Sequence, residues 1–278
     1  MAAIYRPVNL EDALTIIDAE CPLVLAGGTD WMIKRERHSL DTRPVLYVGR
    51  LPELRQIARQ GDTLRIGAAC TLTELLESSL VPEYLEKPLI EMASPAIRNV
   101  ATIGGNICNA SPAADTLPML YATDAVVCLQ SAAGVETLSV QDFILGPGQT
   151  RLGEKQLLTE IQIPLQYGWT CKYRKLGMRR ANSLSKLSFY ALANNVSGTL
   201  TDIRIAFGAI APTVVRCRET ELDILNAVRL GVADALGWIE ERYNKLMHPI
   251  DDVRSSREYR RRVSLRLLTQ YLTEEIRV

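Results

Sequence analysis

The residues of this chain that could do chemistry gather in two short glycine-rich segments. The first covers residues 25–31, with the sequence LAGGTDW, between an apolar stretch and a helical pattern. Glycines let backbone N–H groups approach a ligand closely, since no Cβ is in the way, and a turn that leads into a helix suits a phosphate group. A plain Gly-Gly turn with a Thr or Asp helix cap would have the same sequence, so this segment alone leaves both interpretations open.

The second segment covers residues 101–115, with the sequence ATIGGNICNASPAAD. Thr102, Asn106, Asn109 and Ser111 offer neutral hydrogen-bonding groups, and Asp115 could accept from a sugar or ribityl hydroxyl. A solvated loop normally carries Lys or Glu. This nearly uncharged polar run therefore indicates a wall buried against a hydroxyl-rich ligand, where each polar group needs a partner. The alternative is a structural loop whose side chains bond to one another.

Other kinds of site are not predicted. The chain has no Walker A loop, no G-x-G-x-x-G dinucleotide fingerprint and no G-x-S-x-G nucleophile elbow. Its two histidines, His38 and His248, lie in polar contexts, and no two of its six cysteines lie within four residues of each other. This argues against a histidine triad, a zinc site or an iron–sulfur ligand loop. We therefore expect cofactor chemistry, with no catalytic residue and no metal site on this chain.

The composition is that of an ordinary globular protein. The 278 residues are 47% hydrophobic and 23% charged, and 32 Lys and Arg balance 32 Asp and Glu. A zero net charge gives no reason to expect nucleic acid or a membrane surface as a partner, and no apolar run approaches the length of a membrane span. We expect a cytoplasmic protein with one large domain or two moderate ones.

Hydrophobic periodicity predicts the elements that position the two segments. Strands are expected within residues 22–26, 44–48, 63–69, 125–130, 137–140 and 157–163. Thr71 and Glu74 form a capping-box pattern that opens a helix, and Asp115 is expected to cap a helix that ends at Ala122. Beyond residue 168, the chain predicts an antiparallel sheet within residues 173–177, 186–196 and 203–210. Helical regions over residues 219–247, interrupted at Gly231 or Gly237, and over residues 255–276 follow.

Both glycine-rich segments resemble those of the FAD-binding family of molybdenum hydroxylases, which includes xanthine dehydrogenase and the medium subunit of carbon monoxide dehydrogenase. The matching motifs are AGGTD at 26–30, TIGGN at 102–106 and NASPAAD at 109–115. The resemblance continues through LTEIQIP at 158–164, KYRK at 172–175, FGAIAPT at 207–213 and SREYR at 256–260. It implies an α+β fold: a two-subdomain α/β FAD-binding domain of the PCMH type over residues 1–168, then a C-terminal flavoprotein domain of a small antiparallel sheet plus helices over residues 169–278.

The resemblance also implies which residues bind FAD. Residues 25–31, Thr102, Gly105 and Asn106 would hold the diphosphate and its neighbours, Asn109 and Asp115 the polar chain of the cofactor, and Leu158 and Lys175 the flavin. A lysine at the ring could stabilise the reduced form electrostatically, and the alternative for Lys175 is a plain surface residue. The full predicted set is Leu25, Ala26, Gly27, Gly28, Thr29, Asp30, Trp31, Ala101, Thr102, Gly105, Asn106, Asn109, Asp115, Leu158 and Lys175.

The implied function is electron transfer within a larger enzyme of purine metabolism. The Thr29-Asp30 pair and the Ala211-Pro212-Thr213 segment resemble the xanthine dehydrogenase branch more than the carbon monoxide branch. A large subunit would carry the molybdenum cofactor and a small iron–sulfur subunit two [2Fe-2S] clusters. FAD on this chain would pass the electrons to NAD or another acceptor.

Some features leave alternatives open. Relatives often carry an acidic residue after the paired arginines, where this chain has Ala181, Asn182 and Ser183, and this puts flavin tuning and NAD docking in question. The substrate could instead be carbon monoxide, a nicotinate-like heterocycle or an aromatic thioester, and the chain could also be a non-redox FAD-binding protein. The basic run at residues 260–262 is expected on a solvated or subunit-facing side of the last helix.

Overall fold

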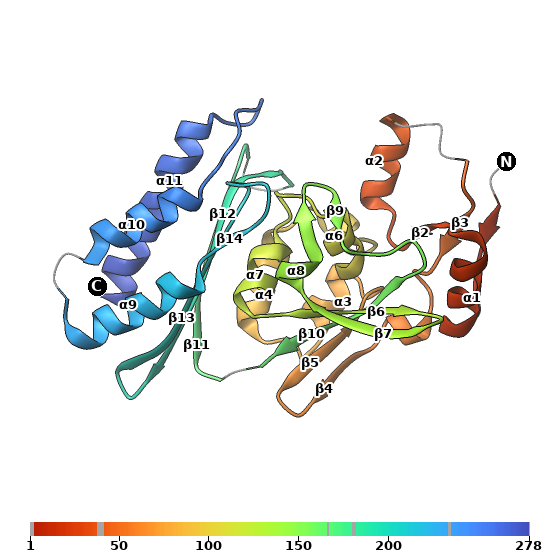
Figure 1. The fold of residues 1–278 in the computed structure, drawn as a ribbon, viewed down its shortest axis with the longest axis horizontal. Helices are drawn as coiled ribbons and strands as arrows, with labels where there is room; N and C mark the ends of the chain where they lie inside the picture. The colour runs from red at the N-terminus through yellow and green to blue at the C-terminus, as the bar shows by residue number, and fades with distance from the viewer. Residues whose placement is uncertain (1–2, 38–41, 166, 180–181, 233–234, 278) are drawn as a thin grey trace. The chain divides into compact units, whose positions relative to one another are not determined.

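The chain forms two compact units in a computed structural model that describes residues 3–37, 42–165, 167–179, 182–232 and 235–277 (Figure 1). His38, Arg180 and Ala181 lie outside the described residues. The first unit contains residues Met1–Pro82, Ala93–Ser111 and Asp124–Leu165, and the second Glu83–Met92, Pro112–Thr123 and Gln166–Val278. Two short segments from the first half of the sequence therefore pack with the second unit.

In chain order, the elements of the first unit are β1 (Ile4–Tyr5), α1 (Leu10–Glu20), β2 (Leu23–Leu25), α2 (Thr29–Arg37), β3 (Val45–Tyr47), a 3-10 turn (Pro52–Leu54), β4 (Ile57–Gln60), β5 (Thr63–Gly67), α3 (Leu72–Glu77), α5 (Pro95–Arg98), α6 (Ile103–Asn109), β6 (Val126–Ser131), β7 (Gly134–Ser139), α8 (Val140–Phe143), β8 (Ile144–Gly146), β9 (Gln149–Thr150) and β10 (Leu157–Pro164). Those of the second unit are α4 (Glu83–Glu91), α7 (Thr116–Ala122), β11 (Trp169–Gly177), β12 (Ser185–Val196), β13 (Thr199–Gly208), β14 (Val215–Arg216), α9 (Arg218–Leu230), α10 (Ala235–Leu246), α11 (Arg257–Tyr271) and a π-helical turn (Leu272–Ile276).

A small parallel sheet in the first unit places two strand ends side by side. Its order is β1-β3-β2, and both outer strands run parallel to β3. On α1, Ala13, Leu14 and Ile17 face the sheet and share a core cluster with Leu46. Parallel strands end at the same edge of a sheet. The first glycine-rich segment, which follows β2, therefore begins beside the segment that follows β3.

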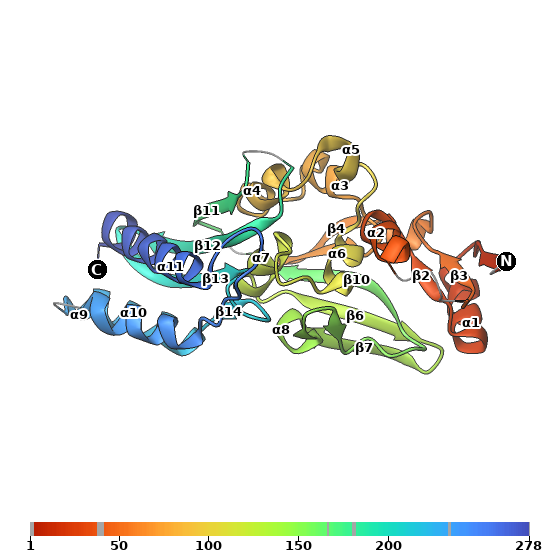
Figure 2. The same cartoon turned by 90° about the horizontal axis from the view of Figure 1, so that it is seen from above.

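A five-stranded antiparallel sheet forms most of the rest of the first unit, with β10 beside β6 (Figure 2). Its order is β4-β5-β10-β6-β7. The strands predicted within residues 63–69, 125–130 and 157–163 are confirmed as β5, β6 and β10. On β10, Ile161 and Ile163 are buried, while Glu160 faces the other side and pairs with Arg65 at 2.8 Å. The alternation of apolar and polar residues seen in the sequence thus places the apolar side chains on one face of the sheet, which is buried.

Residues 101–115, the second glycine-rich segment, are not simply a loop, because α6 lies within them. Thr102 caps the helix, and its Oγ1 accepts a hydrogen bond from the N–H of Gly105 at 3.2 Å. Adjacent glycines conceal a helix from sequence analysis, since each disfavours helix by about 1 kcal/mol. Gly104 is nevertheless needed here, because a Cβ on it would lie 2.6 Å from the carbonyl oxygen of Ala68.

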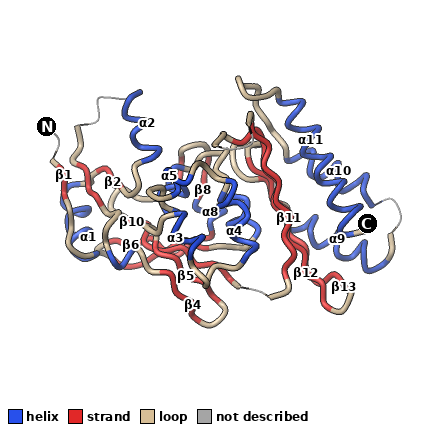
Figure 3. The backbone as a smooth tube through the Cα atoms, turned by 180° about the vertical axis from the view of Figure 1, so that it is seen from behind, coloured by secondary structure: helices blue, strands red, loops and turns tan. Residues whose placement is uncertain are grey.

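The predicted antiparallel sheet of the second unit is confirmed, and it contains β11, β12 and β13 in that order (Figure 3). The short strand β14 pairs with β13 at the edge. Along β12, alternate side chains face opposite ways. Phe189 and Ala191 join the core beneath α9, α10 and α11. On the other face, the hydroxyl of Tyr190 donates to the carbonyl of Tyr84 in α4 at 2.8 Å. The sheet is therefore covered by helices on both faces.

The helical regions predicted near the C-terminus are also confirmed. The first is interrupted at Gly231, which ends α9 in a left-handed conformation (φ 61°), whereas Gly237 lies inside α10. The prediction that residues 260–262 face solvent or a subunit is wrong for Arg260, whose side chain is 1% exposed. Consecutive helical residues are about 100° apart, so a basic run can send one member inward. Arg260 donates to Asp252 at 2.7 Å and to the carbonyl of Ala209 at 3.2 Å.

The partner of Arg260 gives a prediction about pH. Burial alone would raise the pKa of Asp252, but hydrogen bonds from Arg254 and the charges of Arg254 and Arg260 hold it well below its usual value. We expect Asp252→Asn to lower the free energy of unfolding at pH 7 by about 1–3 kcal/mol, as for hydrogen bonds to charged groups. A depressed carboxyl pKa stabilises the fold above the unfolded-state pKa of about 3.9. That contribution is lost as the pH falls through the folded-state pKa.

Urea unfolding at pH 7 and at pH 3 measures this contribution. The difference between wild type and Asp252→Asn should be larger at pH 7 than at pH 3. Asp62→Asn is the matched control, because the Asp62 side chain is 82% exposed in its pair with Arg59. An equal difference at the two pH values would contradict the assignment.

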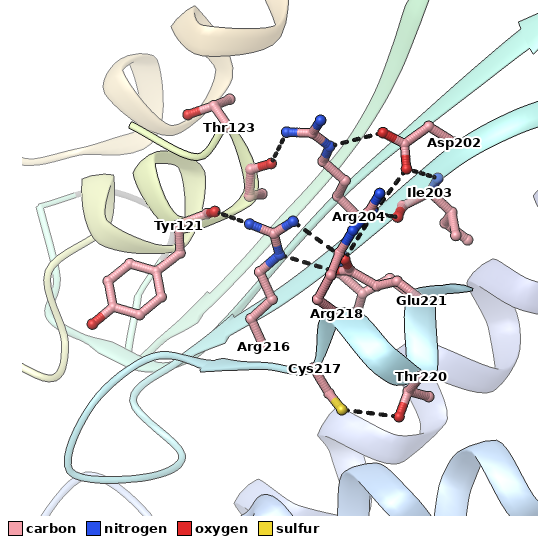
Figure 4. Close-up of polar contacts among 12 residues, drawn as sticks. Tyr121, Thr123, Asp202, Ile203, Arg204, Arg216, Cys217, Arg218, Thr220 and Glu221 are labelled. Carbon is pink, nitrogen blue, oxygen red and sulfur yellow. Dashed lines mark hydrogen bonds and ion pairs between the residues drawn. The ribbon is translucent and has the colours of Figure 1, made fainter. Parts of the chain in front are cut away.

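A buried charge network fastens α7, β13 and α9 together (Figure 4). Glu221 accepts from Arg216 at 3.0 Å, from Arg218 at 3.2 Å and from the backbone N–H of Ile205 at 2.8 Å. Arg216 also donates to the carbonyl of Tyr121 at the end of α7. Strand β14 pairs with β13 only at Ala206 and Phe207. At Ile205, the Glu221 carboxylate accepts the backbone hydrogen bond that a neighbouring strand would otherwise accept.

Candidate functional site

A cavity of about 500 Å³ lies in the first unit at the edge where β2 and β3 end. Its volume is typical of ligand sites, which measure about 300–1,000 Å³. The first glycine-rich segment supplies much of the wall, and the second contributes one threonine. The structure thereby brings together seven of the predicted FAD-binding residues, namely Leu25, Ala26, Gly27, Gly28, Thr29, Trp31 and Thr102.

The two glycines of the first segment are required for different structural reasons. A Cβ on Gly27 would lie 1.9 Å from the carbonyl oxygen of Val100 and 3.0 Å from the Cα of Ala101, so the first segment can approach the start of the second only without a side chain there. Gly28 has φ +76°, a left-handed conformation that favours glycine. Helix α2 begins at the next residue, Thr29, and its first N–H groups have no carbonyl partner within the helix. The turn thus directs backbone donors and the positive helix end toward the cavity wall.

The second segment presents a polar helix face in place of a polar loop. Gly105, Asn106 and Asn109 on α6 are at least partly exposed, whereas Ile103 and Ile107 on the same helix are buried. A second cavity of about 320 Å³ is lined in part by Ala26, Gly105 and Leu158. Ala26 lines both cavities. The two cavities are therefore neighbours on either side of the first segment.

Sequence analysis missed part of the wall of the larger cavity. The residues it did not predict are Met32, Tyr47, Gly49, Arg55, Thr71, Asn99 and Val100. Tyr47 and Gly49 follow β3, and the rule that ligands bind at the carboxyl ends of parallel strands could have found them. Arg55 and Thr71 carry no comparable local signal, because they join the wall only through the packing of β5 and α3.

Arg55 brings a positive charge to the larger cavity, and Glu74 balances it. The Arg55 guanidinium forms an ion pair with Glu74 and donates to the carbonyl of Gly49 at 3.2 Å. Glu74 completes the predicted capping box, which is confirmed, by accepting from the N–H of Thr71 at 2.7 Å. Burial acts to raise the pKa of Glu74, but the hydrogen bonds from Thr71 and Arg55 lower it overall. The carboxylate is therefore ionised at neutral pH and holds Arg55 in the wall.

Asp115 and Lys175 meet in the second unit as a buried ion pair. The Lys175 Nζ donates to Asp115 Oδ2 at 2.6 Å, and the two side chains are 6% and 7% exposed. The alternative of a plain surface lysine is therefore wrong. Asp115 was also expected to cap α7, but its carboxylate makes no cap hydrogen bond. The oxygens turn to Lys175 and to Ser185, which donates at 2.6 Å.

The remaining predicted residues line neither cavity. Asp30 lies in the first turn of α2, and Asn106 and Asn109 lie on α6. Ala101 is buried, and its carbonyl accepts from the N–H of Leu72 at 3.0 Å. For all fifteen predicted residues, the role in FAD binding stays a prediction.

Two further findings limit the chemistry of the described residues. Within them, no group of three or more His, Cys, Asp or Glu side chains could hold a metal ion. Burial raises the pKa of the Cys70 and Cys108 thiols to about 12. At neutral pH both are protonated and poor nucleophiles.

Among the residues that the structure describes, no helix is long and apolar enough to cross a bilayer.

Comparison with known proteins identifies the family. Residues 1–166 match the FAD binding domain in molybdopterin dehydrogenase, and residues 172–275 match the CO dehydrogenase flavoprotein C-terminal domain. The chain is 32% identical to a xanthine dehydrogenase FAD-binding subunit of Escherichia coli, over 99% of this chain and 96% of that protein. It is 30% identical to the glyceraldehyde dehydrogenase medium chain of Sulfolobus acidocaldarius, over 98% of this chain and 96% of that protein.

The fold agrees with this relationship. A carbon monoxide dehydrogenase structure from Hydrogenophaga pseudoflava contains a chain that matches with a TM-score of 0.87 and 24% identity, over 97% of this chain and 95% of that one. The predicted combination of an α/β FAD-binding domain with a C-terminal sheet-and-helix domain is thereby confirmed. The chain belongs to the FAD-binding subunits of the molybdopterin dehydrogenase family, and FAD is its cofactor.

Proposed function

We propose that this chain is the FAD-binding electron-transfer subunit of a xanthine dehydrogenase. The observation that carries the proposal is the cavity of about 500 Å³ lined by the first glycine-rich segment and by Thr102 of the second. We propose the fifteen predicted residues as its FAD contacts, with residues 1–168 as the FAD-binding domain and residues 169–278 as the C-terminal domain. FAD, when bound, supplies the capacity to accept two electrons and to pass them on as a hydride or singly.

The residues around the cavity fit a dinucleotide. Gly27 and Gly28 leave the backbone at the start of α2 open to a ligand, and a helix start favours a diphosphate. Thr29 and Thr102 place hydroxyl-bearing side chains in the same wall. Leu158 lines the smaller cavity, beside Gly105, and offers apolar contact. These residues bind and orient the cofactor, and none of them acts as a nucleophile.

The partners are proposed from the family. We propose that an iron–sulfur small subunit delivers electrons to this chain and that a large subunit with the molybdenum cofactor oxidises the substrate. NAD or another acceptor would take the electrons from FAD. We also propose a cytoplasmic location.

The substrate is the finer part of the proposal. Xanthine is favoured by the 32% identity to a xanthine dehydrogenase subunit and would place the enzyme in purine metabolism. The glyceraldehyde dehydrogenase relative is 30% identical, almost as similar. In the proposed arrangement the substrate binds to the large subunit and not to this chain. Enzymes that act on different substrates would therefore differ in the large subunit. Co-purification with the two proposed partners, followed by assay with xanthine and with glyceraldehyde, decides between the two.

Titration with FAD tests the core of the proposal. The purified chain should bind one FAD with a flavin absorption band, and it should bind FMN more weakly, because FMN lacks the diphosphate and the adenosine. Equal affinity for the two flavins would contradict the role of the glycine-rich segments. A chain that takes up no flavin would contradict the function itself.

A further inference from the structure

We propose that Ser185 is a positioning residue that holds Asp115 as a carboxylate against Lys175 and so fixes the charge presented to the cofactor. The inference rests on the proposed function, in which Asp115 and Lys175 contact FAD. It concerns a residue outside the predicted FAD contacts, and it is carried by a buried cluster within the second unit.

The surrounding backbone fixes the position of Ser185. It is the first residue of β12, is fully buried, and pairs with Gly177 of β11 across the sheet. Its carbonyl accepts a hydrogen bond from Arg254 at 3.3 Å. Its hydroxyl donates to Asp115 Oδ1 at 2.6 Å, while Lys175 donates to Oδ2. Each carboxylate oxygen thus has its own donor, and strand pairing fixes the serine donor.

Other charged and titratable groups face Asp115 from two elements. On β11, Tyr173 is buried, and its hydroxyl interacts with the Asp115 carboxylate and lowers the pKa of Asp115. On α4, the carbonyl of Glu91 accepts from Lys175 at 3.2 Å, and the Glu91 side chain interacts with Lys175, Asp115 and Arg174. The cluster therefore holds the Lys175 ammonium and the Asp115 carboxyl out of bulk water, with Ser185 as a neutral donor and Glu91 at its exposed edge.

The ionisation of Asp115 is a balance between burial and its partners. Burial is the largest influence and raises the pKa of Asp115, while the charge and hydrogen bond of Lys175 and the hydrogen bond of Ser185 lower it. Removing the Ser185 hydroxyl shifts this balance toward the protonated acid. Burial also raises the pKa of Tyr173, so the phenol stays protonated and its interaction with Asp115 remains in a Ser185 variant.

The consequence for the cofactor is electrostatic. With Asp115 ionised, the Asp115–Lys175 pair has no net charge. When Asp115 takes up a proton, the Lys175 ammonium is left without its partner, and a buried positive charge favours the more negative, reduced form of FAD. The Ser185 hydroxyl thus sets the lowest pH at which the pair stays neutral.

The test compares the pH profiles of the FAD reduction potential in the full chain loaded with FAD. The variants are Ser185→Ala, Ser185→Thr, which keeps a hydroxyl, and Ser264→Ala, which removes a buried hydroxyl with no hydrogen-bond partner in the part of the chain that the structure describes. In Ser185→Ala, the break caused by Asp115 should move to higher pH. The potential should be more positive between the two breaks, by about 30 mV for each tenfold gain in preference for reduced FAD. Ser185→Thr should restore the wild-type profile, and Ser264→Ala should leave it unchanged.

The outcomes separate the inference from the proposed function. Superimposable profiles in chains that bind FAD overturn the role of Ser185 and leave the function standing. Lower stability or FAD content without a shifted break marks a purely structural serine and also overturns the inference. A wild-type chain without FAD overturns both. If Ser185→Ala does not fold, Ser185→Cys, which keeps the packing and weakens the donor, carries the same expectation.

Discussion

Gly27→Ala is expected to reduce FAD retention at least tenfold. The new Cβ would lie 1.9 Å from the carbonyl oxygen and 2.8 Å from the carbonyl carbon of Val100. These are backbone atoms, which cannot turn aside as a flexible side chain could, so the two glycine-rich segments must separate. Overpacking of this kind costs about 1–3 kcal/mol. The displaced backbone includes the wall of the larger cavity, where both Gly27 and Val100 lie.

The ratio of flavin to protein absorbance after gel filtration measures the retention. Gly237→Ala is the matched control, because its Cβ meets nothing within 4 Å and it lies inside α10. Helix propensity there favours alanine by about 1 kcal/mol. Gly28→Ala should have an intermediate effect, since its Cβ would lie 3.4 Å from a Leu25 side-chain atom and only its φ of +76° is strained. Circular dichroism shows whether Gly27→Ala remains folded. A folded variant with wild-type FAD content would show that the cavity does not hold the cofactor.

Glu221→Gln is expected to lower the free energy of unfolding by about 3–5 kcal/mol, the usual cost of breaking a buried ion pair. The Glu221 side chain is 0% exposed and that of Arg216 is 3% exposed, so water cannot replace either partner. An amide keeps one acceptor, but it turns an N–H donor group toward Arg216 or Arg218. The guanidinium of Arg216, which lies close to the carbonyl of Tyr121, would then face a neutral amide in place of the Glu221 carboxylate (Figure 4).

Urea unfolding followed by circular dichroism measures this loss. The control is Glu241→Gln, since the pair of Glu241 with Lys245 is 64% and 70% exposed and its removal should leave the unfolding midpoint unchanged. Surface pairs of this kind contribute little, because water screens them. A loss below about 1 kcal/mol for Glu221→Gln would show that the network is hydrated. In that case, it would not be what joins α7 to β13 and α9.

Much of the fold could be predicted from the sequence, because its signals are local. Strands β5, β6 and β10 carry short hydrophobic runs, the α3 cap is a Thr–Glu pair three residues apart, and Gly231 interrupts the predicted helical region. Each of these signals depends on backbone preferences within a few residues. Local backbone preference did not predict α6, because its glycines disfavour a helix. Gly104 is there for close packing against Ala68, which is a tertiary contact.

The candidate site was determined by the sequence only in part. The motifs marked both glycine-rich segments and the family, because a backbone that closely approaches a diphosphate requires glycine wherever it occurs. Tertiary structure decided which glycine touches which segment, and it added Tyr47 and Arg55 to the cavity wall. It also joined Asp115 to Lys175, 60 residues away, and to Ser185, 70 residues away. Such pairs depend on the register of β11 with β12 and on the packing of α7 against the sheet, and the residues near Asp115 in sequence determine neither.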